Sequence, residues 1–234
     1  MILGKNRLYL SVFVTGHCNL DCPYCNQEAF RKQYDTYHMH PDTIRKVCES
    51  LKHIPDVEIS LSGGEPTLWW YINEGCDVIR EYKNIYLTIN SNCVKVDLLS
   101  QLLKTNKIDC VFTDTANTDI RNVDKLKEMF PNKIRVHEWE NAEHKKPPIE
   151  PIEDSLPASC GCHKIGIIGN YALVCPNFFS IVNRIGRDVN YFIGQYVFSL
   201  DDGWLQSILD IGKDKFTMEV CKYCLANNKV WDKI

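Results

Sequence analysis

Three cysteines stand close together near the start of the chain, directly after an apolar run typical of a strand. The loop Thr15-Gly16-His17-Cys18-Asn19-Leu20-Asp21-Cys22-Pro23-Tyr24-Cys25 spaces them as C-x3-C-x2-C. Three thiolates on one short loop can hold three irons of a 4Fe–4S cluster, which leaves the fourth iron free for an exogenous ligand. A structural zinc ion, normally closed by four protein ligands, is the alternative, with His17 as the fourth.

A second motif, Ser62-Gly63-Gly64-Glu65-Pro66, directly follows the next predicted strand. Glycines let a backbone approach a ligand closely, and Glu65 offers an acceptor, so the motif suits an ammonium group. By itself it is equally typical of a tight turn. Its pairing with the cysteine loop, after a neighbouring strand, favours ligand binding.

Together these motifs resemble the radical S-adenosylmethionine (SAM) superfamily: a C-x3-C-x2-C loop with an aromatic residue before its third cysteine, then GGEP after the second strand. The resemblance covers the N-terminal half of the chain. It implies that a 4Fe–4S cluster binds SAM and that reduction cleaves SAM to a 5′-deoxyadenosyl radical. It also implies the roles of individual residues: cluster ligands Cys18, Cys22 and Cys25; adenine contact Tyr24; methionyl contacts Gly63, Gly64, Glu65 and Pro66; ribose and carboxylate contacts Asn90, Ser91 and Asp114.

A second set of cysteines lies in the C-terminal part of the chain: Cys160, Cys162, Cys175, Cys221 and Cys224. Four thiolates from such a set can hold another cluster or a structural zinc ion. The order resembles the twitch auxiliary domain of some radical SAM enzymes, a shorter relative of the SPASM domain. That resemblance implies a second, fully ligated 4Fe–4S cluster that passes electrons or holds the fold. Five cysteines compete for four places, so either Cys160 or Cys162 is spare, and family spacing favours Cys160 as the ligand.

The elements that must position these groups alternate between strand-like and helix-like patterns over residues 1–140. We predict strands at 8–14, 57–61, 85–89, 108–112 and 134–139, separated by helical stripes that start near residues 41, 72, 96 and 123. This alternation favours parallel strands joined by right-handed crossovers. Five units are too few for a closed eight-stranded barrel, so we expect an α/β partial barrel. Ligands bind beyond the carboxyl ends of such strands, where both motifs lie.

The expected domain organisation is a radical SAM partial barrel over residues 1–144, a proline-rich linker over 145–158 and a twitch-like domain over 159–234. In the last of these, Gly169-Asn170 between two apolar runs predicts a β-hairpin. Trp204, Ile208 and Ile211 predict a short amphipathic helix.

The composition is that of a globular protein outside a membrane: 44% hydrophobic and 24% charged residues among 234, with a net charge of −3. No apolar run approaches the ~20 residues that span a bilayer, and no targeting signal stands out. We therefore expect a cytoplasmic protein that binds neither a membrane nor a nucleic-acid polymer. In that compartment clustered cysteines more often bind metal than form disulfides. The isolated cysteines are expected to be buried and inert: Cys48, Cys76, Cys93 and Cys110.

The function these features favour is a radical SAM oxidoreductase or isomerase. Its substrate is expected to be a small molecule of sugar, aminocyclitol or nucleoside type, and its electron donor a protein such as flavodoxin or ferredoxin. A peptide-modifying radical SAM enzyme is the first alternative, although the early first strand leaves no room for an N-terminal peptide-recognition module. A non-catalytic zinc or iron–sulfur protein is the second. Trp69 and Trp70, after the GGEP turn, are expected to pack in the core.

Overall fold

The computed structural model describes residues 7–22, 25, 27–116, 118–138, 164–201 and 203–211. Its strands are β1 (Leu8–Thr15), β2 (Val57–Gly63), β3 (Ile85–Asn90), β4 (Cys110–Asp114), β5 (Ile134–His137), β6 (Lys164–Ile168), β7 (Tyr171–Leu173) and β8 (Val197–Ser199). Its helices are α1 (Glu28–Gln33), α2 (Pro41–Leu51), α3 (Ile72–Arg80), α4 (Val96–Lys104), α5 (Ile120–Met129), α6 (Phe178–Arg184) and α7 (Trp204–Ile211), with 3₁₀ turns η1 (Pro66–Leu68) and η3 (Val189–Phe192).

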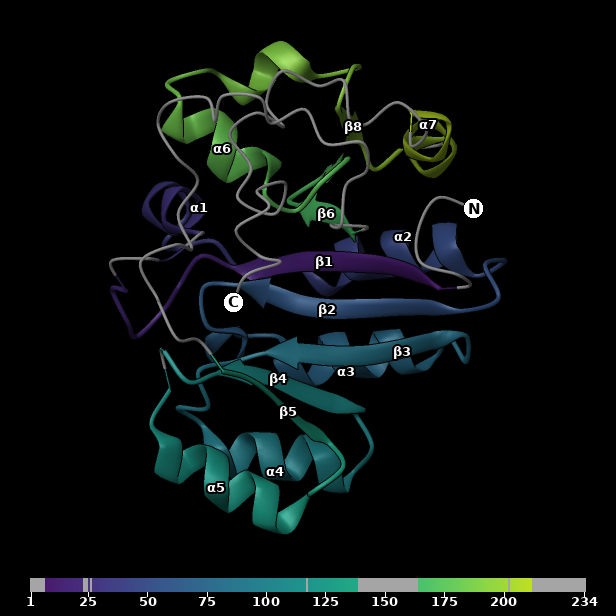
Figure 1. Cartoon of the computed structure of the whole chain (residues 1–234). Coiled ribbons are helices and arrows are strands. Elements are labelled where there is room, and N and C mark those ends of the chain that lie inside the picture. Colours follow the sequence, from purple (N-terminus) through teal and green to yellow (C-terminus); the bar gives the residue numbers. More distant parts are fainter. Residues whose placement is uncertain are drawn as a thin grey trace.

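All of these strands form a single sheet in the order β5-β4-β3-β2-β1-β6-β7-β8 (Figure 1). The pairs from β5 through β1 to β6 are parallel, and the β6–β7 and β7–β8 pairs are antiparallel. This arrangement confirms the predicted α/β fold with a mainly parallel sheet.

Burial on both faces explains the composition of the central strands. In β1 every residue except Tyr9 is buried, and β2 is buried except at Ser62, as expected for parallel strands covered on both sides. Helix α2 starts as predicted, with Pro41 in its first turn and the His40 ring accepting from the backbone N–H of Asp42. Helices α2 and α3 lie behind β1, β2 and β3 in Figure 1.

The carboxyl ends of β1, β2 and β3 meet at one edge of the sheet, where the arrowheads point in Figure 1. The register between β1 and β2 brings Thr15 opposite Gly63, with an irregularity after Phe13. The cysteine loop and the GGEP turn therefore leave the sheet side by side. Helix α1 follows the cysteine loop at the same edge.

The described C-terminal residues extend the N-terminal sheet. Strand β6 pairs in parallel with β1, and the predicted hairpin forms across Gly169, whose φ of +55° suits a glycine in the turn. Helix α6 packs against α1, with the rings of Phe179 and Phe30 centred 6.3 Å apart. The predicted linker lies outside the described residues, so the domain boundaries remain a prediction.

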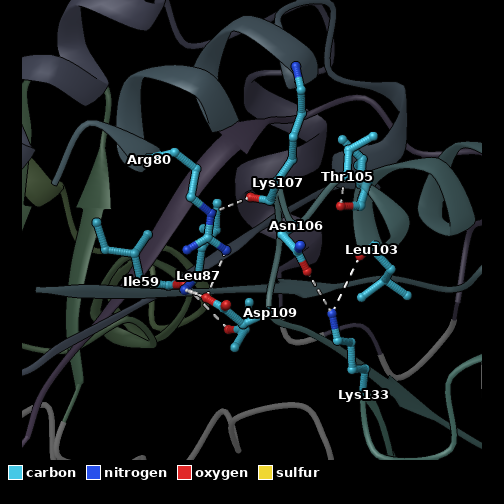
Figure 2. A network of polar contacts seen from close by, with 11 residues as sticks. Ile59, Arg80, Leu87, Leu103, Thr105, Asn106, Lys107, Asp109 and Lys133 are labelled. Carbon is cyan, nitrogen blue, oxygen red and sulfur yellow. Dashed lines mark hydrogen bonds and ion pairs between the residues drawn. The ribbon is translucent and has the colours of Figure 1, made fainter. Parts of the chain in front are cut away.

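Strand β4 begins two residues later than the sequence predicts because Asp109 bonds through its side chain. Its Oδ2 accepts from the backbone N–H of Leu87 at 2.7 Å and from the Arg80 guanidinium at 2.8 Å. Arg80 Nε also donates to the Lys107 carbonyl oxygen at 2.9 Å. Figure 2 shows Arg80 and Leu87 converging on Asp109, which directly precedes β4.

Replacing Asp109 by alanine is expected to lower the free energy of unfolding by about 1–3 kcal/mol. The Leu87 N–H and the Arg80 guanidinium would then lose the carboxylate oxygen that accepts their hydrogen bonds. Urea denaturation of the metal-free protein measures the change. The control is Asp77→Ala, which removes an exposed partner of Lys107 and is expected to cost less than about 1 kcal/mol. Equal losses in the two variants would contradict a special role for Asp109.

Candidate functional site

Thr15, the last residue of β1, fixes the start of the cysteine loop. Its buried hydroxyl donates to the Tyr37 carbonyl at 3.0 Å and accepts from the His17 backbone N–H at 3.1 Å. Its carbonyl oxygen accepts from the Gly64 N–H at 2.6 Å. One buried threonine thus joins the loop, the segment after α1 and the GGEP turn.

The glycines of the second motif let two backbones touch. The Glu65 N–H donates to the His17 carbonyl oxygen at 2.8 Å. A Cβ on Gly64 would lie 2.1 Å from that same oxygen, and one on Gly63, whose φ is +114°, would lie 2.4 Å from the Thr15 oxygen. The close approach in this structure is therefore between the GGEP turn and the cysteine loop.

Glu65 ties the GGEP turn to the loop after β3. Its side chain is buried, and Oε1 accepts from the Thr67 N–H at 2.9 Å, the Thr67 hydroxyl at 2.6 Å and the Ser91 hydroxyl at 2.8 Å. Oε2 accepts from the Asn92 N–H at 2.7 Å. Burial raises the pKa of Glu65, and the hydrogen bonds from Thr67, Asn92 and Ser91 oppose that rise.

A further hydrogen bond closes the link between the three loops. Asn92 Nδ2 donates to Asn19 Oδ1, inside the cysteine loop, at 2.9 Å. The segments after β1, β2 and β3 are therefore one connected unit. Of the other predicted contacts, Asn90 ends β3 half-buried, and Asp114 ends β4 with its Oδ1 accepting from the Ala116 N–H at 3.0 Å.

The three cysteines of the loop, Cys18, Cys22 and Cys25, are half-buried free thiols. Burial raises the pKa of Cys22, and the nearby charges of Cys25 and Cys18 raise it further, with a smaller contribution from Asp114. Burial also raises the pKa of Cys18. Because the thiolate is the metal-binding form, a bound cation would offset this cost.

The three thiols come from one short loop, and each could bind its own iron of a cluster. Among the residues that the structure describes, no group of three or more His, Cys, Asp or Glu side chains is arranged to hold a single metal ion. The exposed His17 ring faces the His38 ring, with centroids 6.5 Å apart.

Two buried polar atoms beside the loop are also consistent with a bound group. Gln27 Oε1 and Arg31 Nε have no hydrogen-bond partner among the described residues. Orphaned buried polar atoms are rare in proteins and each calls for an explanation, such as a ligand. Both side chains come from the segment that starts two residues after Cys25.

Cys175 is the one member of the second cysteine set within the described residues. It follows β7, and its Sγ accepts from the Asn177 backbone N–H at 3.4 Å. The remaining predicted ligands and the predicted adenine contact lie outside the described residues: Tyr24, Cys160, Cys162, Cys221 and Cys224.

The isolated cysteines are buried, as predicted. Burial raises the pKa of Cys48 and of Cys76 to about 12 and that of Cys93 to about 11, so these thiols stay protonated and inert. Cys93 adopts a φ of +59°, unusual for a residue with a side chain. This strained position directly follows the Ser91-Asn92 contacts to Glu65.

The two tryptophans after the GGEP turn differ. Trp69 is buried, and its Nε1 donates to the Met39 carbonyl oxygen at 2.9 Å, so the core prediction is confirmed. For Trp70 the prediction is wrong: it is 76% exposed and stacks on His38, with ring centroids 4.2 Å apart.

Within the described part of the chain, no helix is both long and apolar enough to cross a membrane.

Sequence reasoning missed two residues of the site. Arg31 lies on α1, which shows no periodic apolar stripe, and Asn19 contacts Asn92 across two loops. The GGEP motif predicted that the loops after β1 and β2 meet, but nothing in the sequence signals the Asn19–Asn92 pair.

A partial α/β barrel with a three-cysteine loop after its first strand and a glycine-rich turn after its second defines the class of this protein. The Radical SAM superfamily model matches residues 12–143, more than half of the chain. The chain belongs to the radical SAM superfamily.

Several curated proteins and solved structures are similar to it. A probable GTP 3′,8-cyclase from Methanocaldococcus jannaschii is 28% identical over 120 residues, which are 50% of this chain and 40% of that protein. A 7,8-dihydro-6-hydroxymethylpterin dimethyltransferase from the same organism is 28% identical over 102 residues, 43% of this chain and 20% of that protein. The chain thus matches less than half the length of these curated relatives.

Solved structures match over a greater length. The crystal structure of BtrN in an open conformation superposes with a TM-score of 0.62 and 16% identity, covering 95% of this chain and 94% of that one. BtrN in complex with AdoMet and 2-DOIA gives 0.59 and 17%, covering 91% and 83%. Streptococcus suis SuiB bound to the precursor peptide SuiA gives 0.50 and 16%, covering 95% and 72%. At these identities the likeness shows the fold alone.

Proposed function

We propose that this radical SAM enzyme cleaves SAM reductively and uses the resulting radical to oxidise or isomerise a small molecule of sugar, aminocyclitol or nucleoside type. The observation that carries the proposal is the connected unit of three loops at the carboxyl ends of β1, β2 and β3. It brings the three thiols, the GGEP turn and the Ser91-Asn92 segment together, where ligands of such sheets bind.

In this proposal Cys18, Cys22 and Cys25 hold a 4Fe–4S cluster. When bound, the cluster supplies the electron that splits SAM. The chain's own residues position the nucleotide: Gly63, Gly64, Glu65 and Pro66 lie around its amino group, and Asn90, Ser91 and Asp114 around ribose and carboxylate. Glu65 Oε2 accepts one hydrogen bond from the described residues, so it has the capacity to accept another from an ammonium group.

The choice of a small substrate is supported by the relatives. The curated relatives with the name GTP 3′,8-cyclase act, by that name, on a nucleotide, and BtrN, whose fold covers most of this chain, was crystallised with AdoMet and 2-DOIA. Peptide modification is the second candidate, and the specific observation that favours it is the fold similarity to SuiB bound to its precursor peptide. An external one-electron donor such as flavodoxin or ferredoxin and a cytoplasmic location belong to the same proposal.

The deciding experiment is anaerobic incubation of the reconstituted chain with SAM and dithionite, followed by chromatography for 5′-deoxyadenosine and methionine. Equimolar release of both products is the expected result, because cleavage of one SAM would give one molecule of each. A zinc protein or a non-catalytic iron–sulfur protein would release neither product.

We also propose that Cys175 and three of the four cysteines Cys160, Cys162, Cys221 and Cys224 hold an auxiliary 4Fe–4S cluster in a twitch-like region. The hydrogen bond from the Asn177 N–H to Cys175 Sγ supports this, because such bonds to ligand sulfurs tune iron–sulfur clusters. With four protein thiolates the cluster has no open iron, which suits electron transfer and not substrate binding.

Reconstituted wild-type protein is expected to carry about eight irons per chain, and Cys175→Ser about four, since each cluster holds four irons. Iron and zinc analysis by plasma emission measures both. Cys110→Ser, at a buried cysteine in β4, is the control and should keep about eight. About four irons and one zinc in the wild type would instead make the second site a structural zinc site.

A further inference from the structure

Arg31 reaches from α1 onto the cysteine loop. Its guanidinium donates to the Leu20 carbonyl oxygen and lies 3.9 Å from Asp21 Oδ1. The Arg31 side chain is only 14% exposed, whereas that of Asp21 is 88% exposed. The arginine is therefore held against the loop, and its carboxylate neighbour is in water, where an ion pair at this distance contributes little.

Helix α1 is anchored firmly enough to hold Arg31 in place. Phe30, the residue before it, is fully buried, and its ring meets that of Phe13 on β1 edge-on at 5.3 Å. Phe179 of α6 also packs on the Phe30 ring, with the ring centroids 6.3 Å apart. Arg31 thus lies on a helix that packs against the core through its neighbour Phe30.

The charge of Arg31 lies close to the thiols. Leu20, whose carbonyl oxygen accepts from the guanidinium, is midway between Cys18 and Cys22 in the sequence, and the Arg31 side chain also forms a hydrogen bond with Cys25. An arginine is charged at every physiological pH, so a fixed positive charge lies beside the three cluster ligands.

The same face of α1 carries unsatisfied polar atoms. Arg31 Nε and Gln27 Oε1 are buried without a hydrogen-bond partner among the described residues. The two residues are four apart and hence on one side of the helix, joined by the Arg31 N–H to Gln27 carbonyl bond of 2.9 Å. Burying such atoms is costly unless a bound group satisfies them.

We infer that Arg31 is a positioning residue for the N-terminal cluster: it fixes the loop through the Leu20 carbonyl and stabilises the reduced cluster by its charge. The inference rests on the proposed function, which places the cluster there. On reduction the cluster gains one electron from an external donor, dithionite in the test below, and no bond forms or breaks. A nearby cation stabilises the added negative charge and so raises the reduction potential.

The test is a redox titration of reconstituted protein followed by electron paramagnetic resonance. The signal that shifts on adding SAM identifies the N-terminal cluster. Arg31→Gln is expected to lower the ratio of reduced to oxidised cluster about tenfold at a given potential, which is about 59 mV in midpoint potential for one electron. Arg31→Lys keeps the charge and is expected to keep the wild-type potential.

Lys32→Gln is the matched control. It removes the next positive charge along the helix, but Lys32 is 70% exposed and paired with Glu28 at 2.7 Å, so the potential should not move. An unchanged potential in a fully loaded Arg31→Gln, or an equal fall in Lys32→Gln, overturns the inference. If Arg31→Gln does not retain iron, then an Arg31→Lys variant that retains its iron supports the role of the charge. Loss of iron from both variants overturns the inference.

Failure of this inference is distinguishable from failure of the proposed function. If the wild-type protein cleaves SAM and Arg31→Gln has the wild-type reduction potential, only the inferred role of Arg31 is wrong. If the wild-type protein shows no cluster signal that responds to SAM, the proposed function itself is wrong.

Discussion

Cys22→Ala is expected to abolish release of 5′-deoxyadenosine, lowering it at least 10³-fold under anaerobic conditions with SAM and dithionite. Three thiolates on the loop are the full set of protein ligands proposed for this cluster, so the loss of one leaves an iron without its protein ligand. Chromatography of the nucleoside product, expressed per iron bound, measures the effect. Because the cluster supplies the electron, no other side chain can compensate.

Cys48→Ala is the control for Cys22→Ala. Cys48 is buried in α2, and burial raises the pKa of its thiol to about 12. This variant should retain most of the cleavage activity. Wild-type activity in Cys22→Ala would show that the loop holds no SAM-cleaving cluster, and equal loss in both variants would point to a general failure of folding.

Gly64→Ala is expected to lower SAM cleavage about 10²-fold, because the added methyl group would lie 2.1 Å from the His17 carbonyl oxygen and 2.7 Å from that of Gly16. The obstacles are backbone atoms, so either the GGEP turn or the cysteine loop must move. Displacements of about 1 Å at a reacting centre cost about that factor. Initial rates of 5′-deoxyadenosine release, with SAM affinity from equilibrium dialysis, measure the change.

Gly169→Ala separates crowding from backbone strain. Gly169 lies in the β6–β7 turn with a φ of +55°, and a Cβ there meets no atom within 4 Å. The variant should lose about 1–2 kcal/mol of stability and keep its SAM cleavage. If Gly64→Ala matched the wild type in cleavage rate and SAM affinity, close contact between the two backbones would be unnecessary for the site.

Much of the sheet was predictable because its central strands are buried on both faces and are separated by amphipathic helices. The strands around Leu10, Ile59 and Leu87 appear as apolar runs of strand length, and α2 carries a stripe of apolar residues at helical spacing. Strand β4 was placed too early because a side chain, that of Asp109, takes the hydrogen bond of a strand backbone. The spacing of apolar residues along the chain does not reveal that a side-chain oxygen has replaced a backbone oxygen as the acceptor.

The parts of the site that escaped prediction depend on contacts distant in sequence. Helix α1 is short and packs through Phe30 without a regular stripe, so the position of Arg31 was not foreseeable. The buried Glu65 carboxylate accepts four hydrogen bonds, which come from residues on two different loops. The motif indicated an acceptor at Glu65, but only the fold reveals that the carboxylate also braces the turn.

The parallel pairing of β6 with β1 has a consequence for how the chain acquires its structure. Residues 164–168 supply the hydrogen-bonding neighbour on one side of β1, and β1 is the strand that leads into the cysteine loop. Until they emerge from the ribosome, β1 is an open edge that invites association with other chains. Such long sequence separation slows folding. The segment matched by the family model, residues 12–143, therefore leaves out the strand that pairs with β1 on that side.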